Sequence, residues 1–468
     1  MQGIRKLFRW LLVCSSLLVA TIVLIYLALV LINWRDDPAS SAAQQLDRIH
    51  AERPAVATPD NAYLYMLGFT AADDQDPIEL GRQRVEWMRW ASQQPWTEDL
   101  IEPEYPRWTS HDHELPLFVE PLTQACNTNN GQCTQRLEGH EPRLAEWLEQ
   151  EHLLLQRYQE LIKLPAMYEP LPYNIRFAFP EYQHPLKGQR LYLVDVWKIA
   201  RQGNLHQAQE MLDTDLRFWR MALANSDILI SRLIANAAIR QHFLWSIQLF
   251  QDQDKYAGLL PTQAWREPAT EGERSWRRTL SGEAAFVDDY LQQMKARELN
   301  WLTDEKGDED SLKQQAIKAL GPPLLLRQTS MNRYADLLLE LDEIFSAPYS
   351  TMEDAKQRAE YLESSRKITE LNFSHLRNLG GFILEAQASE TGFTGYMLRV
   401  TDLEGLRRAS VLLADMRNQR IAANQAAAYV QSSELRDPYR EQPFGWDTKT
   451  SSLLFDGLSE DNSYRLTY

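Results

Sequence analysis

The segment at residues 226–250 is largely apolar, and it contains three polar residues spaced four apart: Arg232, Asn236 and Arg240. In a helix, residues four apart lie next to each other on one side, so these side chains are expected to form a polar strip on a buried helix. An arginine removed from water needs an anionic partner. The strip therefore predicts either an internal salt-bridge network or a groove that binds a carboxylate, a phosphate or an acidic sugar. We expect the network first, because buried charges are usually paired inside the fold.

A carboxylate that could pair with this strip lies on another expected helix, residues 142–164. Its apolar residues repeat with the helical period, and Glu151 falls at the centre of their stripe, whereas Glu149 points to the opposite side. We therefore expect Glu151 and Arg240 to be buried, each within hydrogen-bond distance of an opposite charge, and Glu149 to be exposed. Further candidate partners for the arginines are Glu283, Asp288 and Asp289. The candidate binding residues are thus Glu151, Arg232, Asn236 and Arg240.

Two short patterns have the spacing of metal ligands. One is His111-Asp112-His113-Glu114, and the other is Glu149 with His152. The first lies in a polar segment beside prolines, with no second ligand cluster to complete a site. The second requires Glu149 to face a core, and the helical pattern turns it to solvent. The chain also has no nucleophile elbow, no nucleotide-binding glycine loop and no zinc-protease helix. We expect no metal and no cofactor, and we assign no catalytic residue.

The cysteines depend on the compartment in which the chain folds. Cys126 and Cys133 bracket six polar residues, and Cys14 lies inside an apolar run. Six intervening residues are too many for a usual redox pair, and no second ligand pair is present for zinc. If the segment is exported, a disulfide between Cys126 and Cys133 is the expected result.

Residues 10–34 predict that the chain is exported. They contain no charge, and 25 helical residues extend roughly 37 Å, enough to cross a hydrocarbon core of about 30 Å. Trp10 and Trp34 stand at the two ends, where aromatic rings favour the membrane interface. A cleaved signal peptide usually has an apolar region of only about 7–15 residues. We therefore expect an uncleaved transmembrane anchor.

Flanking charges predict the orientation of this anchor. Arg5, Lys6 and Arg9 precede the span, and Asp36 and Asp37 follow it. Positive residues stay in the cytoplasm, so the N-terminus is expected inside and the rest of the chain in the periplasm of a Gram-negative type of envelope. The net charge of the chain is −16, which disfavours binding to nucleic acid.

Helical periodicity dominates the rest of the sequence, so we expect an all-α extracytoplasmic domain built from antiparallel helix hairpins. Residues 191–204 and 205–223 form one such hairpin. It resembles a single tetratricopeptide hairpin, but no second copy follows, so we treat it as a generic helix pair. Residues 403–433 are expected to form the last long helix. Short strands near residues 444–446 and 453–455 predict a small C-terminal β-hairpin.

The domain organisation expected from these features has five parts. They are a cytoplasmic tail (1–9), the anchor (10–34), a linker (35–60), a helical subdomain with the disulfide loop (61–320), and a C-terminal helical subdomain that ends in the hairpin (321–468).

These features predict a membrane-anchored protein with a binding or scaffolding role in the cell envelope and with protein partners there. One alternative is a helical hydrolase or lyase that acts on an envelope polymer and uses Glu151 near Arg232 and Arg240. Another is a ligand-binding domain. A closed, fully paired network of Glu151 and the arginines favours the scaffold, and the same residues lining an open pocket favour the alternatives.

Overall fold

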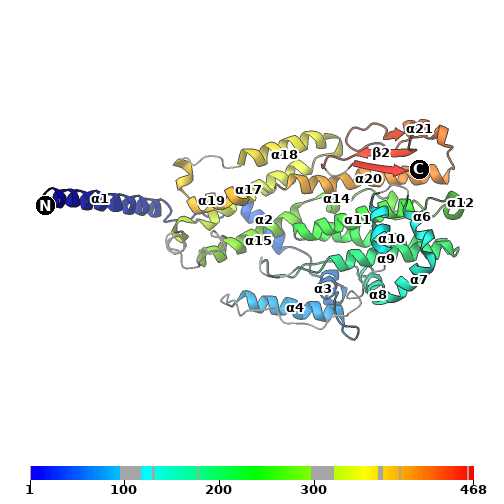
Figure 1. Cartoon of the computed structure of the whole chain (residues 1–468), viewed down its shortest axis with the longest axis horizontal. Coiled ribbons are helices and arrows are strands. Elements are labelled where there is room, and N and C mark those ends of the chain that lie inside the picture. Colours follow the sequence, from blue (N-terminus) through cyan, green and yellow to red (C-terminus); the bar gives the residue numbers. More distant parts are fainter. Residues whose placement is uncertain are drawn as a thin grey trace. The chain divides into compact units, whose positions relative to one another are not determined.

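The structure is a computed structural model of the chain and is about 70% helical (Figure 1). It describes residues 2–94, 118–128, 132–174, 177, 179–296, 321–366, 373–388, 392–460 and 463–468. The all-α class expected from the sequence is confirmed.

The helices, in chain order, have the following bounds. They are α1 (Gln2–Ile32), α2 (Ser41–Ala51), η1 (Thr58–Asp60), α3 (Ala62–Leu67), α4 (Pro77–Ser92), α5 (Val119–Thr128), α6 (Cys133–Gly139), α7 (Glu141–Gln150), α8 (His152–Leu161), α9 (Gln183–Arg201), α10 (Leu205–Asn225), α11 (Leu229–Leu249), α12 (Gln253–Tyr256), α13 (Gln263–Arg266), α14 (Glu271–Arg274), α15 (Arg277–Ala296), η4 (Pro322–Leu324), α17 (Arg327–Phe345), η5 (Tyr349–Thr351), α18 (Met352–Arg366), η6 (Phe373–Leu376), α19 (Leu379–Ala388), α20 (Thr394–Asn418) and α21 (Ala423–Ser432).

The chain divides into two compact units. The smaller one, unit 1, comprises Met1–Arg48, Ala284–Glu340 and Tyr361–Gly392. The larger one, unit 2, comprises Ile49–Glu283, Leu341–Glu360 and Phe393–Tyr468.

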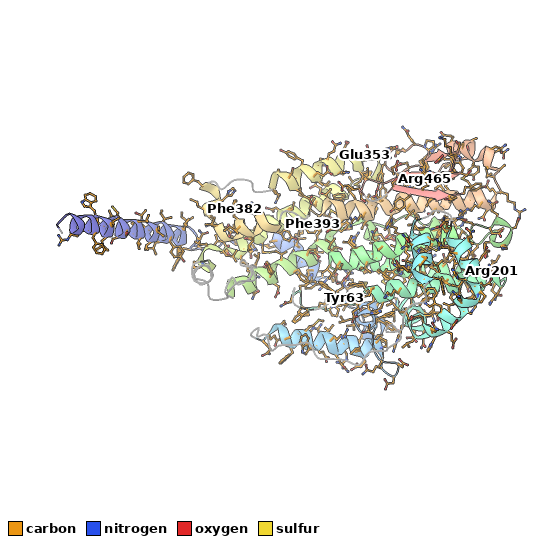
Figure 2. The ribbon with its side chains drawn as sticks, viewed as in Figure 1. Tyr63, Arg201, Glu353, Phe382, Phe393 and Arg465 are labelled. Atoms are coloured by element: carbon orange, nitrogen blue, oxygen red, sulfur yellow. A yellow bond between two sulfur atoms is a disulfide. The ribbon has the colours of Figure 1, made fainter. Side chains whose placement is uncertain are left out.

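Unit 1 contains α1, whose apolar side chains are exposed (Figure 2). Residues Phe8–Ile32 are long and apolar enough to cross a membrane, a property that a membrane anchor and a signal sequence share. Asn33 follows the helix, is buried, and donates to the carbonyl oxygens of Leu29 at 2.8 Å and Leu376 at 2.9 Å. Asp36 then accepts the backbone N–H groups of Gln328 and Thr329, at 2.9 and 3.0 Å. These hydrogen bonds attach the segment after α1 to η6 and to the N-terminus of α17.

Unit 2 is built around α9, α10 and α11, which lie side by side (Figure 1). Three residues connect α9 to α10, and Gly203 among them has a φ of +88°, a conformation that glycine adopts without strain. Tyr192 Oη donates to the carbonyl of Met211 at 3.1 Å, and the two residues are nearly equidistant from the turn, so the helices are antiparallel. The expected hairpin is confirmed. Helix α11 is buried along most of its length, as its apolar composition predicts.

Two expected helices are each divided in the structure. Residues 142–164 form α7 and α8, which meet at Glu151, where φ is −98° and ψ is 22°. Residues 403–433 belong to α20 and α21, which are separated by a turn where Arg420 has a φ of 51°. The apolar period continues across both breaks, so periodicity alone does not reveal them.

The C-terminal residues form a small antiparallel sheet beside α20 (Figure 1). Its strands are β1 (Gly445–Asp447), β2 (Ser452–Asp456) and β3 (Ser463–Thr467), in the order β1-β2-β3. The expected hairpin is β1–β2, in which Trp446 pairs with Leu453. Strand β3 was not predicted from the sequence.

Helix α20 approaches the sheet closely because Gly405 has no side chain. A Cβ at this position would lie 1.9 Å from the ring of Phe455, and that ring is buried. This contact requires glycine at residue 405.

The disulfide between Cys126 and Cys133 joins α5 to α6, with 4.6 Å between the two Cα atoms. Both cysteines are fully buried, whereas Cys14 on α1 is exposed and unpaired. The pairing expected from the sequence is confirmed.

Candidate binding pocket

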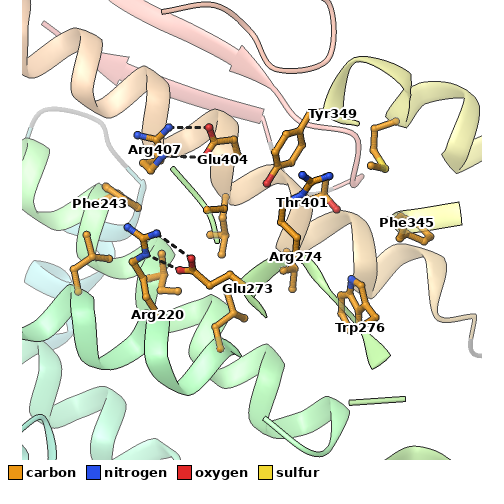
Figure 3. Close-up of a pocket in the computed structure, with 17 residues that line it drawn as sticks. Arg220, Phe243, Glu273, Arg274, Trp276, Phe345, Tyr349, Thr401, Glu404 and Arg407 are labelled. Atoms are coloured by element: carbon orange, nitrogen blue, oxygen red, sulfur yellow. Dashed lines mark hydrogen bonds and ion pairs between the residues drawn. The ribbon is translucent and has the colours of Figure 1, made fainter. Parts of the chain in front are cut away.

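A pocket opens in unit 2 between α10, α11, α20 and two further segments, one around α14 and one around η5 (Figure 3). Its cavity volume is about 50 Å³. Most of the lining is apolar, with aromatic rings from Phe243, Trp276 and Phe345. Five charged side chains also line it, and their arrangement gives the pocket its chemistry.

The first pair of charges closes one wall. Arg220, on α10, donates from Nε and Nη2 to the two carboxylate oxygens of Glu273, at 2.5 and 2.9 Å. Glu273 is held in place because it also accepts the backbone N–H of Thr270, at 2.6 Å, in a capping box that begins α14. Arg220 donates from Nη1 to the carbonyl oxygens of Ala264 and Glu267 as well. All its nitrogens therefore have acceptors within the fold.

The second pair lies one helix away, on α20. Arg407 donates from Nε and Nη2 to Glu404, at 2.8 and 2.7 Å, and from Nη1 to the carbonyl of Trp265, at 2.8 Å. Arg408 donates to the same carboxylate, at 2.7 Å. Burial would raise the pKa of Glu404, but the hydrogen bonds and charges of the two arginines outweigh burial and lower it. Glu404 is thus held as a carboxylate.

Arg274 differs from the other lining arginines. It donates from Nη2 to the carbonyl of Ala347, at 2.8 Å, and lies over the ring of Tyr349, 4.7 Å from its centroid. Figure 3 shows the two side chains next to each other at the pocket. In the part of the chain that the structure describes, no carboxylate forms an ion pair with Arg274. Three arginines against two glutamates leave the lining with one positive charge in excess.

Arg232 supports the wall of this pocket from behind. It is fully buried and stacks on Trp276, 4.3 Å from the ring centroid. It donates to the carbonyl oxygens of Glu273, at 2.6 Å, and Leu223, at 3.2 Å. Burial lowers the pKa of Arg232 to about 9, and the charges of Glu273 and Asp342 oppose this shift.

The carboxylate partners expected for Arg232 are therefore wrong, because main-chain carbonyls and an aromatic ring surround it instead. Glu283, one expected partner, accepts the backbone N–H of Leu229 at 2.7 Å and so lies at the N-terminus of α11. The helical pattern of residues 226–250 predicts that Arg232 is buried. It does not show which backbone carbonyl oxygens from other parts of the chain will accept its hydrogen bonds.

The other two residues of the expected polar strip, Asn236 and Arg240, lie in different surroundings. Asn236 is buried, and its Oδ1 has no hydrogen-bond partner among the residues that the structure describes. Arg240 is exposed and lies 5.6 Å from the ring centroid of Tyr464, so the prediction that it is buried is wrong. Eight residues turn a helix by about 80° beyond two full turns, which is enough to move Arg240 off the buried side that holds Arg232.

Glu151 is buried, as predicted, with 5% of its surface exposed, and Glu149 is exposed. Its burial comes from its place at the junction of α7 and α8 rather than from an unbroken stripe. Neither Arg232 nor Arg240 contacts Glu151 among the interactions of the described residues. The expected cluster of Glu151 with the two arginines is not assembled.

A buried polar network, which the sequence analysis missed, joins α8, α9, α10 and α11 in unit 2. Asp215 accepts from His242 Nδ1 at 2.6 Å, from Gln189 Nε2 at 3.0 Å and from the hydroxyl of Tyr158. Trp265 Nε1 donates to His242 Nε2 at 2.8 Å, so this ring nitrogen carries no proton and His242 is neutral. Every donor in the network has a named acceptor, which indicates a structural role.

A second carboxylate cluster lies near the N-terminus of α11. Asp227 is fully buried between Arg53, at 2.6 Å, and Arg278, at 2.5 Å. Glu169, also fully buried, accepts the backbone N–H of Asp227 at 2.9 Å. Burial and the charge of Asp227 raise the pKa of Glu169 well above its usual value. No local sequence pattern predicts this cluster, because its residues are far apart along the chain.

From the sequence, neither of the two patterns with metal-ligand spacing was expected to bind a metal ion. The His111–Glu114 pattern lies outside the described residues. Within the ranges that the structure describes, no group of three or more histidine, cysteine, aspartate or glutamate side chains is placed to hold a metal ion.

The chain was compared with protein-family models, curated proteins and solved structures, and none of them matches it.

Proposed function

We propose that this chain is a membrane-anchored binding protein of the cell envelope. In this proposal α1 is an uncleaved anchor, the N-terminus is cytoplasmic, and both units act on the other side of the membrane. The positive residues before α1 and the disulfide between Cys126 and Cys133 support this orientation. Protein partners in the envelope, as the sequence analysis expects, are part of the proposal.

The observation that carries the proposal is the pocket with an excess arginine. Glu273 and Glu404, the carboxylates that line it, are both held by arginines, so neither is available as a general base. The hydroxyl of Thr401 donates to the carbonyl of Met397, and no carboxylate of the lining accepts a hydrogen bond from the hydroxyls of Tyr349 and Thr401. Such a pocket can recognise a ligand but has no group poised to transform it.

The second candidate, a hydrolase or lyase of the envelope, is favoured by a different observation. Glu169 has the raised pKa of a general acid, and the neighbouring Asp227 is a carboxylate fixed by two arginines. Both carboxyl groups are fully buried, however, and neither lines the pocket. This burial is why we rank binding above catalysis.

Native mass spectrometry of the full chain, purified from membranes in a non-ionic detergent, tests the proposal. We expect a co-purified small molecule or protein partner, and no turnover when the same preparation is incubated with envelope polymers. Turnover that is lost in Glu169→Gln and retained in Glu149→Gln would establish the enzyme instead.

A further inference from the structure

We propose that the pocket of unit 2 binds a small carboxylate with a compact apolar body, and that Arg274 and the hydroxyl of Tyr349 hold its carboxylate group. This inference rests on the proposed binding function and names the class of ligand. Three features of the pocket support it: the unused hydrogen-bond donors of Arg274, the net charge of the lining and the apolar wall.

The donors of Arg274 are incompletely used. A guanidinium has five N–H groups, and in Arg220 and Arg407 each of the three nitrogens has an acceptor in the fold. In Arg274 only Nη2 donates, to Ala347, so Nε and Nη1 have no acceptor among the described residues. Nη2 has two hydrogens, and the carbonyl of Ala347 takes one of them. The other can act together with the hydrogen of Nε or of Nη1, and either pair matches the two oxygens of a carboxylate.

Tyr349 supplies a third polar group beside Arg274. Its ring is half-buried under the guanidinium, and its hydroxyl has no hydrogen-bond partner in the described part of the chain. Burial, together with the charge of Glu404, raises the pKa of Tyr349, so the hydroxyl keeps its proton and can donate to an anion.

The charge of the lining selects a monoanion. Glu273 and Glu404 are neutralised by their arginines, and Arg274 is the cation that remains without a carboxylate. A phosphate dianion would need a second available cation, and the nitrogens of Arg220 and Arg407 are already in use. A neutral ligand would leave the guanidinium donors without a charged acceptor.

The apolar part of the pocket lining indicates what the rest of the ligand is like. Trp276, Phe345 and Phe243 give the pocket an apolar wall, and its cavity volume of about 50 Å³ is several times the roughly 10–15 Å³ that one water molecule needs on the same measure. A single ring or a short branched chain can lie against this wall. We therefore infer an aromatic or short alkyl carboxylate.

Phenylacetate is the probe for the test, with the neutral phenylacetamide and with acetate, which lacks the apolar body, as comparisons. Binding is measured by titration calorimetry on the full chain in a non-ionic detergent. We expect phenylacetate to bind at least about tenfold more tightly than either comparison, because only phenylacetate satisfies both the guanidinium and the aromatic wall. Equal affinity for phenylacetate and phenylacetamide would overturn the role given to the carboxylate.

Two variants locate the site. Arg274→Gln should weaken phenylacetate binding at least about tenfold and leave phenylacetamide unchanged, and Tyr349→Phe should weaken phenylacetate binding by a smaller factor. Arg217→Gln, at an exposed arginine that pairs with Glu267 outside the lining, is the matched control and should bind as the parent chain does. Thermal unfolding without ligand verifies that each variant is folded. Unchanged binding in a folded Arg274→Gln variant would exclude this pocket as the site.

Two further outcomes separate the ligand class from the function on which it rests. Displacement of phenylacetate by palmitate would assign the pocket to a lipid and overturn the small-molecule class. If the chain binds phenylacetate but a topology reporter places unit 2 in the cytoplasm, the ligand class stands and the proposed envelope function fails. If unit 2 lies outside and phenylacetate does not bind at millimolar concentration, the ligand class fails alone.

Discussion

At the scale of single residues, the main finding is that this protein solvates a buried cation with its own backbone. Arg232 has no exposed surface, and its hydrogen bonds go to two carbonyl oxygens and a threonine hydroxyl rather than to a carboxylate. Its guanidinium also stacks on Trp276, which lines the pocket. Arg232 therefore fixes the shape of the pocket wall without contacting a ligand.

Replacing this residue should be costly. In Arg232→Ala the carbonyls of Leu223 and Glu273 lose a buried donor, and each unsatisfied group costs about 1–3 kcal/mol, so the free energy of unfolding should fall by about 2–6 kcal/mol. Chemical denaturation of the full chain in detergent measures the change. Arg240→Ala, on the same helix but exposed, should change stability by less than about 0.5 kcal/mol. Equal effects of the two substitutions would contradict the assignment.

Asp36 gives a residue-scale prediction that depends on pH. Burial would raise its pKa, but hydrogen bonds from the backbone of Gln328 and Thr329 outweigh burial and lower the pKa from its usual value of 3.8. A group with a lowered folded pKa stabilises the fold above the unfolded value, and this contribution is lost as the pH falls through the folded pKa.

The stability difference between the parent chain and Asp36→Asn should therefore be constant near neutral pH and should shrink as the pH falls below about 3.8. Denaturation of both chains between pH 6 and roughly pH 2.5 measures this difference. A difference that grows on acidification would show that the carboxylate has no native-state partner.

At the scale of elements, the contact between α20 and the C-terminal sheet depends on one missing side chain. Gly405 lets the buried ring of Phe455 lie against the helix backbone. The same helix also contains Gly395, where an added Cβ meets no atom within 4 Å. The two glycines thus provide a matched pair on one helix.

Gly405→Ala should destabilise unit 2 by about 1–3 kcal/mol, because the methyl group must displace the Phe455 ring. Gly395→Ala should be neutral or raise stability by up to about 1 kcal/mol, since alanine favours the helix over glycine. Thermal unfolding of the two variants gives the comparison. Destabilisation of the same size in both variants would indicate helix propensity rather than packing as the cause.

At the scale of the whole molecule, the proposed function depends on which side of a membrane the two units occupy. The structure contains α1 as an exposed apolar helix and a disulfide in unit 2, and both agree with an exported chain. Asn33 and Asp36 attach the chain directly after α1 to the folded part of unit 1. An anchor followed by such contacts holds unit 1 next to the end of the span.

A reporter enzyme that is active only outside the cytoplasm, fused after Tyr468, should be active, because Arg5, Lys6 and Arg9 keep the N-terminus inside. The mass of the chain in membranes should include residues 10–34, which distinguishes an anchor from a cleaved signal sequence. Reversing the charges at Arg5, Lys6 and Arg9 to glutamate should reduce the reporter signal. Activity of a cytoplasmic reporter alone would reverse the topology.

Features that depend on a local pattern of residues could be predicted from the amino-acid sequence. Helical periodicity predicted α9, α10 and α11, and the apolar run predicted α1. The expected export of the segment after that run predicted the bridge between Cys126 and Cys133. The helices could be predicted because helical periodicity and apolar runs involve residues only a few positions apart. The breaks at Glu151 and Arg420 were not predicted, because the apolar period runs through both.

The pocket could not be predicted from the sequence, because its lining comes from distant parts of the chain. The pocket combines Arg220 and Arg274 with Arg407, which lies more than a hundred residues further along the chain, and no local pattern records that meeting. The polar strip on residues 226–250 was visible in the sequence, but its members diverged: Arg232 turned to backbone carbonyls and Arg240 to solvent. A sequence shows that a buried charge must be satisfied, whereas the partner is chosen by chain segments that come together only in the packed fold.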